Sequence, residues 1–270
     1  MNNKYIIGSG WWCNESNVQT DRDERLTYGD DEIRGSSFQK KWINSITKNC
    51  SPEKIVIIDS ASPTPPPNLA FHNNDVQYIR LNDNGGHASN HTGKLCGWSR
   101  GVIMSANYAA NCDCQYYVYV EQDVLLKGEN IIEHAISKMK KPYMFGSNKG
   151  NNQPLQQSFF IIKHSHLNKF IARYLMMDYR DDEISPEVKF ALCTSNLYRM
   201  IPKALFKIIL PNKLLGRITY RMQLLLAKAL ASFDQLPFGA GRERPLDFST
   251  QHLYFQHANK NELEAFSKVD

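Results

Sequence analysis

Short apolar runs, each followed by a polar or glycine-bearing turn, recur along the first two thirds of the chain. Runs of Ile, Val, Tyr and Phe that are continuous rather than alternating predict strands buried on both faces, as in a parallel sheet. Apolar residues at spacings of three and four predict amphipathic helices between them. The expected strands cover residues 5–10, 54–60, 76–81, 116–126, 143–146 and 157–163, and the expected helices cover 35–49, 97–110 and 131–139.

This order of strands and helices predicts a doubly wound α/β fold, with a mixed or parallel sheet and helices on both faces. Right-handed crossovers bring the turns after its parallel strands to one edge, where ligands of open α/β sheets bind. We expect a catalytic core over residues 1–187. A C-terminal helical extension and a tail that folds back on the core are expected over residues 188–270.

The run over residues 116–126 carries two carboxylates, Glu121 and Asp123, near its end. Side chains two apart in an extended chain point the same way, so the two acids are expected on one side. Such a pair can hold a hard divalent cation, and the cation can hold a diphosphate. A solvated strand end that happens to carry acids is the competing interpretation.

Other polar residues lie where ligand-binding turns are expected. Ser9 stands between two glycines at the end of the first strand, Asp59 ends the second, and Asn84 begins the turn after the third. Asp182 and Glu187 lie at the head of a helix that begins near Pro186. The helix dipole alone explains acids at that position, so a catalytic role there needs further support.

Composition places the chain among folded proteins, with 42% apolar and 22% charged residues in a length of 270. The net charge of +5 is compatible with an anionic substrate or an anionic surface. No secretory signal and no apolar run long enough to cross a membrane are recognised, so a cytoplasmic location with reduced cysteines is expected. Cys112 and Cys114 lack the further ligands of a zinc site.

Residues 188–233 contain no acid, although eight Lys and Arg residues punctuate this Leu- and Ile-rich segment. Lys213, Arg217, Arg221 and Lys228 fall at spacings of four, four and seven and form a basic stripe on a predicted helix. Basic amphipathic helices bind anionic membrane surfaces. An ordinary helix that covers the sheet with a solvated basic face is the alternative.

The segment from Tyr5 to Leu126 resembles the nucleotide-binding half of the GT-A glycosyltransferases. The resemblance consists of an acid after the second strand (Asp59), an Asn/Gly turn after the third (84–86), a helix with Ser99-Arg100-Gly101, and an Asp-x-Asp-type motif. It implies that Asp59 binds the base or ribose and that Ser9, Asn84, Arg100 and Glu121 contribute to the nucleotide site. The motif departs from the family pattern because it reads Glu-Gln-Asp.

The resemblance also implies a divalent cation, Mn²⁺ or Mg²⁺, with Asp123 as its direct ligand. A C-terminal histidine that folds back to the metal occurs in several GT-A families, and His257 is the candidate here. A carboxylate at the head of a later helix often acts as general base toward the acceptor. This role would fall to Glu187 or Asp182.

We therefore expect a glycosyltransferase that moves a sugar from a nucleotide diphosphate donor to a glycan or lipid-linked acceptor. The resemblance makes assembly of a bacterial surface polysaccharide (O-antigen or capsule) the natural setting, on the inner face of the plasma membrane. The expected partners are the nucleotide sugar, the acceptor and an anionic membrane surface, and no nucleic acid. The alternatives are a sugar-nucleotide nucleotidyltransferase and an inactive membrane-associated scaffold subunit.

Overall fold

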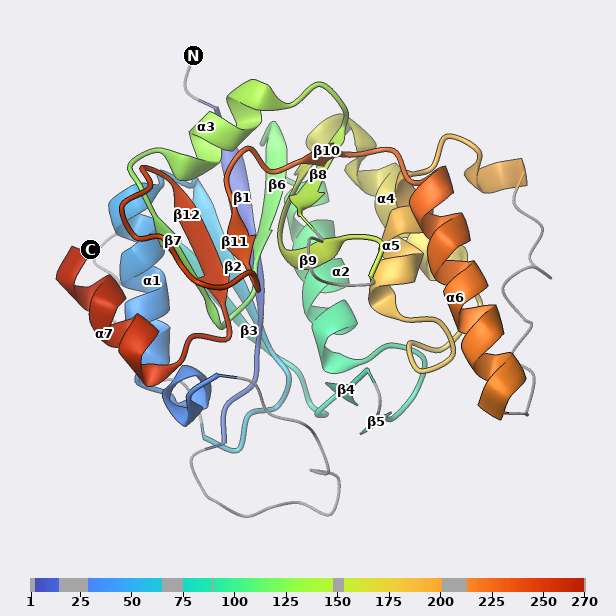
Figure 1. Ribbon diagram of the computed structural model, residues 1–270, viewed down its shortest axis with the longest axis horizontal. Helices are drawn as coiled ribbons and strands as arrows, with labels where there is room; N and C mark the ends of the chain where they lie inside the picture. Colours follow the sequence, from blue (N-terminus) through green and yellow to red (C-terminus); the bar gives the residue numbers. More distant parts are fainter. Residues whose placement is uncertain are drawn as a thin grey trace.

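A seven-stranded mixed sheet forms the centre of the molecule (Figure 1). The computed structural model describes residues 3–14, 29–64, 75–88, 90–147, 153–200 and 213–269. The strand order is β10-β8-β9-β6-β1-β2-β3, and β9 runs antiparallel to its neighbours β6 and β8. The strands are β1 (Tyr5–Trp11), β2 (Lys54–Asp59), β3 (Val76–Arg80), β6 (Tyr116–Val120), β8 (Tyr143–Gly146), β9 (Gln156–Lys163) and β10 (Asp234–Gln235).

Helices cover both faces of this sheet, which explains why its central strands are apolar without alternation. In β1, Tyr5 and Ile7 enter one hydrophobic cluster and Ile6 enters the other. One face carries α1 (Phe38–Asn49), α3 (Ile131–Lys138) and α7 (Lys260–Val269). The other carries α2 (Gly97–Ala110), α4 (His164–Met176), α5 (Pro186–Thr194) and α6 (Lys213–Leu230). The expected doubly wound α/β class is thereby confirmed.

A second, three-stranded sheet lies on the face that carries α1, and it consists of β11 (Ala240–Gly241), β12 (Leu253–Gln256) and β7 (Val124–Lys127). Its central strand, β12, runs antiparallel to β7, so the C-terminal tail is paired with a segment more than a hundred residues earlier. The remaining short elements are η1 (Asp31–Arg34), β4 (Gly86–His87), β5 (Asn90–His91) and η2 (Tyr198–Met200).

The expected continuous strand over residues 116–126 is wrong in one respect, because it is two strands in different sheets. β6 ends at Val120, the chain turns at Glu121-Gln122-Asp123, and β7 continues in the smaller sheet. The other predicted strands and helices agree with the observed bounds to within about three residues, and α2 agrees at both ends. The two carboxylates therefore lie in a turn between strands rather than on an extended strand end.

Helix α6 packs beside α5 at the margin of the molecule opposite α7 (Figure 1). The tail then returns to the core, where β10 joins the main sheet next to β8. The division of the chain at residue 188 stays a prediction. Among the described residues, none of the helices combines the length and the apolar character needed to cross a bilayer.

Candidate functional site

The Glu121-Gln122-Asp123 turn is fixed by hydrogen bonds to three surrounding segments. Val124 N donates to Glu121 O at 3.0 Å and closes the turn, and Glu121 N donates to Ser158 O at 2.8 Å. The Trp42 indole donates to Glu121 O at 2.9 Å. The side chain of Gln122 bridges the turn to the end of β1, because it contacts both the amide (2.6 Å) and the carbonyl (3.1 Å) of Trp12.

Gln256, at the end of β12, joins the two carboxylates of the motif. Its Nε2 donates to Glu121 Oε2 at 2.9 Å and to Asp123 Oδ1 at 3.2 Å. Its Oε1 accepts from Gln156 Nε2 at 3.2 Å and from Arg242 Nε at 3.1 Å. The Gln256 side chain is buried and uses both ends of its amide, so it holds the two acids side by side.

His257 follows Gln256 and lies against the same motif, with its Nε2 3.3 Å from Asp123 Oδ2. Its backbone adopts a left-handed conformation with φ of 58°, which is uncommon for a residue other than glycine. The loop at Gly29 packs on this backbone so closely that a Cβ at position 29 would lie 2.8 Å from His257 C. The imidazole is therefore positioned by β12 and by this loop together.

The Gly-rich loop at residues 239–242 brings Arg242 to the motif. Gly241 has a φ of 50°, and a Cβ there would lie 2.8 Å from the hydroxyl oxygen of Tyr254. Because β11 pairs with β12, the following Arg242 is placed at Gln256. The guanidinium remains exposed, so it can also meet an anion from solvent.

Two carboxylates near Arg242 have pKa values above the usual range. Burial raises the pKa of Asp123, while the Gln256 hydrogen bond and the Arg242 charge oppose that shift. Burial also raises the pKa of Glu187, in the first turn of α5, and Arg242 again counteracts it. The charge of Arg242 therefore acts on both the motif and the head of α5. A carboxyl with a raised pKa is suited to proton transfer near neutral pH.

The donor atoms at the motif fit a divalent cation that is completed by substrate. Two ligands of one octahedral cation, each at about 2.1 Å, lie about 3 Å apart, close to the observed Asp123–His257 separation of 3.3 Å. Across the described ranges, no three His, Cys, Asp or Glu side chains gather as a complete metal site. Mg²⁺-type sites commonly use one or two protein ligands and fill the others with phosphate and water oxygens.

Asp59 ends β2, Ser9 lies two residues before the end of the neighbouring strand β1, and both are buried. The Asp59 carboxylate accepts from the Ser62 amide at 3.3 and 3.2 Å and from the Ser62 hydroxyl, and it lies 3.8 Å from Arg80 Nε. Ser9 Oγ donates to the carbonyl of Gly10 at 3.3 Å. These polar groups shape the strand ends, and their contact with a nucleotide stays a prediction.

Asn84 and Arg100 stabilise the connection between β3 and α2. Asn84 Oδ1 accepts from Gly86 N at 2.9 Å. A Cβ at Gly85 would lie 2.6 Å from Gly97 N, so this turn can approach the N-terminus of α2 only with glycine. Arg100 Nε and Nη2 donate to the carbonyls of Leu95 (3.0 Å) and Thr92 (3.1 Å). Their predicted nucleotide role is untested.

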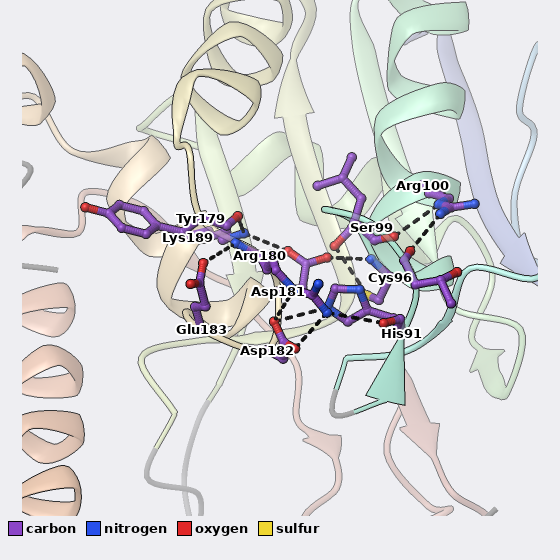
Figure 2. A network of polar contacts seen from close by, with 12 residues as sticks. His91, Cys96, Ser99, Arg100, Tyr179, Arg180, Asp181, Asp182, Glu183 and Lys189 are labelled. Atoms are coloured by element: carbon purple, nitrogen blue, oxygen red, sulfur yellow. Dashed lines mark hydrogen bonds and ion pairs between the residues drawn. The ribbon is translucent and has the colours of Figure 1, made fainter. Parts of the chain in front are cut away.

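Asp182 lies beside Arg180 and His91 (Figure 2). Arg180 donates to its two carboxylate oxygens, each at 3.0 Å, and these hydrogen bonds lower the pKa of Asp182. His91 Nε2 is 3.7 Å from Asp182 Oδ1. A carboxylate held ionised in this way is a weaker proton acceptor than Glu187, whose pKa is raised. The role of either residue as general base stays a prediction.

The preceding residue, Asp181, is the centre of a buried network shown in Figure 2. Asp181 Oδ1 accepts from Lys189 Nζ at 2.8 Å and from the Tyr174 hydroxyl at 3.0 Å, and Oδ2 accepts from Cys96 N at 2.8 Å. Burial opposes its charge, yet Lys189 and the hydrogen bonds hold the pKa of Asp181 below its usual range. Lys189, counted among the basic residues of the acid-free segment, is thus buried in the core.

Sequence reasoning missed Gln256 as a site residue and did not assign Arg242 to the site. The signals available in the sequence were the apolar run over residues 253–255, shortly before His257, and the glycines that precede Arg242. Neither signal shows which strand the C-terminal tail pairs with. The position of these residues at the motif follows only from the β12–β7 register.

No protein-family model and no curated protein sequence matches the chain. Solved structures with some similarity include TarS residues 1–349 of S. aureus in complex with UDP (TM-score 0.42, 11% identity, 70% of this chain and 54% of that chain). A proposed glucose-1-phosphate thymidylyltransferase from Bacillus anthracis, in complex with a sucrose, gives a TM-score of 0.44 at 9% identity over 99% of this chain and 94% of that chain. The chain thus spans about half the length of the TarS fragment. Similarities with TM-scores this low do not indicate a function for this protein.

Proposed function

We propose that the protein is a divalent-cation-dependent glycosyltransferase that uses a nucleotide diphosphate sugar. The observation that supports this most directly is the convergence of Asp123, His257 and Glu121 around Gln256, beside the exposed guanidinium of Arg242. A carboxylate, an imidazole and a guanidinium are the groups that hold a cation–diphosphate pair. The resemblance of residues 5–126 to GT-A enzymes points to the same substrate class.

Each residue has a defined task in this proposal. Asp123 and His257 would ligate Mn²⁺ or Mg²⁺, and Gln256 would orient Asp123 and Glu121. The cation, when bound, stabilises negative charge on the leaving diphosphate. Arg242 would contact the phosphate oxygens, and Glu121 would act through a water or a sugar hydroxyl.

Glu187 is proposed as the general base toward the acceptor hydroxyl if the reaction inverts the anomeric centre. Its pKa is raised by burial, so its basicity lies closer to the neutral range that proton transfer requires. The acceptor is proposed to be a glycan or lipid-linked sugar, and the proposed setting is bacterial surface-polysaccharide assembly at the cytoplasmic face of the membrane.

The test is calorimetric titration of UDP, GDP, dTDP and CMP into the protein with and without Mn²⁺, followed by a screen for slow hydrolysis of the matching sugar nucleotides. We expect binding of one nucleotide to require Mn²⁺ and its sugar nucleotide to be hydrolysed. Nucleotide binding that is absent, or unchanged by the metal, would overturn the proposal and favour the scaffold alternative.

A sugar-nucleotide nucleotidyltransferase is the second candidate function, and the position of Arg242 supports it. Such enzymes carry a Gly-rich, Arg-containing loop after the first strand, whereas here the loop lies near the C-terminus. The β11–β12 pairing nevertheless brings its arginine to the motif. Incubation of the preferred sugar nucleotide with pyrophosphate and Mg²⁺ separates the two: release of a nucleoside triphosphate identifies the nucleotidyltransferase, and release of a nucleoside diphosphate identifies the glycosyltransferase.

A further inference from the structure

Helix α6 presents large apolar side chains to solvent. Ile218, Met222 and Leu225 are 48%, 63% and 66% exposed. They follow one another at spacings of four and three, which places them on one face of the helix. Of the ten large apolar side chains exposed among the described residues, four lie on α6, so this exposure is concentrated rather than scattered. We call Ile218, Met222 and Leu225 the apolar stripe.

The apolar stripe is not the face by which α6 joins the core. Leu224 and Ala227 are buried and belong to the hydrophobic cluster that includes α5, and Gln223 is buried beside them. On a helix with 100° per residue, the directions of these buried residues and of the stripe differ by more than 90°. The helix therefore covers the core with one face and exposes a second apolar face.

Basic residues flank the apolar stripe. Arg221 and Lys228 are exposed and lie four residues before and three residues after Leu225, on the adjoining sector of the helix. Lys213 and Arg217 continue the series in the sequence, and residues 188–233 contain no acid. Asp234, the first acid after the helix, accepts from the backbone amides of Lys140 and Lys141 at 2.7 and 2.6 Å.

We propose that α6 is an interfacial helix that docks the protein on an anionic lipid bilayer, with the apolar stripe inserted among the lipids and Arg221 and Lys228 at the headgroups. Arg221 and Lys228, which are exposed on a segment without acids, select an anionic surface, and the stripe supplies the apolar area that such a helix buries. The proposal goes beyond the transfer reaction, because membrane binding requires neither nucleotide nor metal.

The test is co-sedimentation of the full chain with phosphatidylcholine vesicles containing 30% phosphatidylglycerol, in parallel with pure phosphatidylcholine vesicles. We expect binding to the anionic vesicles only, and weaker binding at high salt. Met222→Ser/Leu225→Ser should lower the vesicle partition coefficient at least about tenfold, because apolar insertion is lost. Arg221→Gln/Lys228→Gln should lower it about 25-fold, since each basic residue near an anionic surface contributes roughly fivefold.

Matched controls change the same residue types elsewhere on the surface. Leu175→Ser/Met176→Ser removes two exposed apolar side chains at the end of α4, and Lys40→Gln/Lys138→Gln removes two exposed charges on α1 and α3. Both should bind vesicles like the parent. Circular dichroism melting should show that all four variants fold, because the changed side chains are exposed.

Three results would overturn the proposal. They are absence of parental binding to anionic vesicles, equal losses in the control pairs, and unchanged binding of Met222→Ser/Leu225→Ser. Sedimentation velocity without vesicles tests whether a second copy of the chain, rather than a bilayer, covers the apolar stripe. A parental dimer that Met222→Ser/Leu225→Ser converts to monomer, with no vesicle binding, would assign the stripe to self-association instead.

Discussion

Two aspartates inside this protein have pKa values that are shifted in opposite directions. Asp181 contacts the Lys189 ammonium, the Tyr174 hydroxyl and the Cys96 amide, and its pKa is lowered. Asp123 contacts an amide and lies near an imidazole, and its pKa is raised by burial. The chain thus supplies the counter-cation for Asp181 but only part of the stabilisation for Asp123.

This difference separates a structural acid from a candidate binding acid. A buried carboxylate with its cation built into the fold ties α2, α4 and α5 together, and both of its oxygens already accept hydrogen bonds from the protein. A buried carboxylate whose charge is only partly stabilised by the protein is stabilised further when a cation from solution binds to it. The predictions below test this contrast, beginning with the largest expected effect.

Glu187→Gln should lower the rate of sugar transfer about 10²- to 10⁴-fold, the usual contribution of a positioned general base. Binding of the donor nucleotide should stay near the parental value, because the amide keeps the shape of the side chain. Steady-state kinetics with donor and acceptor measure the rate. The control is Asp182→Asn, which should change the rate little because Arg180 already holds that carboxylate. A larger loss in Asp182→Asn would reverse the assignment.

Asp123→Asn should weaken Mn²⁺-dependent nucleotide binding by more than about 100-fold, beyond the 10- to 100-fold typical of residues that only orient a ligand. Glu121→Gln should lose less, since its amide oxygen can still accept from Gln256. Titration of Mn²⁺ and nucleotide against both variants measures the effect. Parental affinity in Asp123→Asn would mean that the motif is not a metal site.

Lys189→Met should lower the free energy of unfolding by about 3–5 kcal/mol, because it leaves the Asp181 charge buried without its partner. Urea unfolding followed by circular dichroism measures this change. Asp181→Asn/Lys189→Met should recover part of the loss, since the double change removes the unpaired charge. Equal destabilisation by the single and double changes would show that packing, rather than charge, dominates this network.

Gln256→Ala should weaken Mn²⁺ affinity about 10- to 100-fold, as expected for a residue that orients a ligand. Its amide otherwise holds Glu121 and Asp123 together. Gln251→Ala, an exposed glutamine on the same tail, is the matched control and should behave like the parent. Isothermal titration of Mn²⁺ in the presence of nucleotide makes the comparison, and an unaffected Gln256→Ala would remove the orienting role.

The smallest expected effect is on the pH dependence of the free energy of unfolding, because this effect is confined to acid solution. Asp181 has a folded-state pKa below its unfolded value, so its stabilisation is complete above about pH 4 and is lost as the pH falls through the folded pKa. The difference in unfolding free energy between the parent and Asp181→Asn should therefore shrink below about pH 4. A constant difference from pH 7 to pH 3 would contradict this.

Several features of the fold could be predicted because they depend on neighbours in the chain. Buried runs of Ile, Val and Tyr identified the strands of the main sheet, and α2 was predicted with both ends correct because Trp98, Val102, Ala106 and Ala109 repeat at helical spacing. The position of Glu121 and Asp123 after an apolar run was also visible in the sequence. These are local signals, with a period of two or 3.6 residues.

Other features required the tertiary structure. The motif lies in a turn between sheets because β7 pairs with β12, and the Gln256–Asp123 contact joins residues 133 positions apart. Asp181 and Asp182 are adjacent and chemically identical, yet one is buried with Lys189 and the other is exposed with Arg180. The periodicity of the sequence cannot show which of two adjacent aspartates is buried. The burial and the bonding partners of each residue depend on which distant elements pack around it. The sequence alone determined which elements form and where their acids stand, whereas long-range pairing decided which acid meets a lysine and which lies beside a glutamine amide and an imidazole.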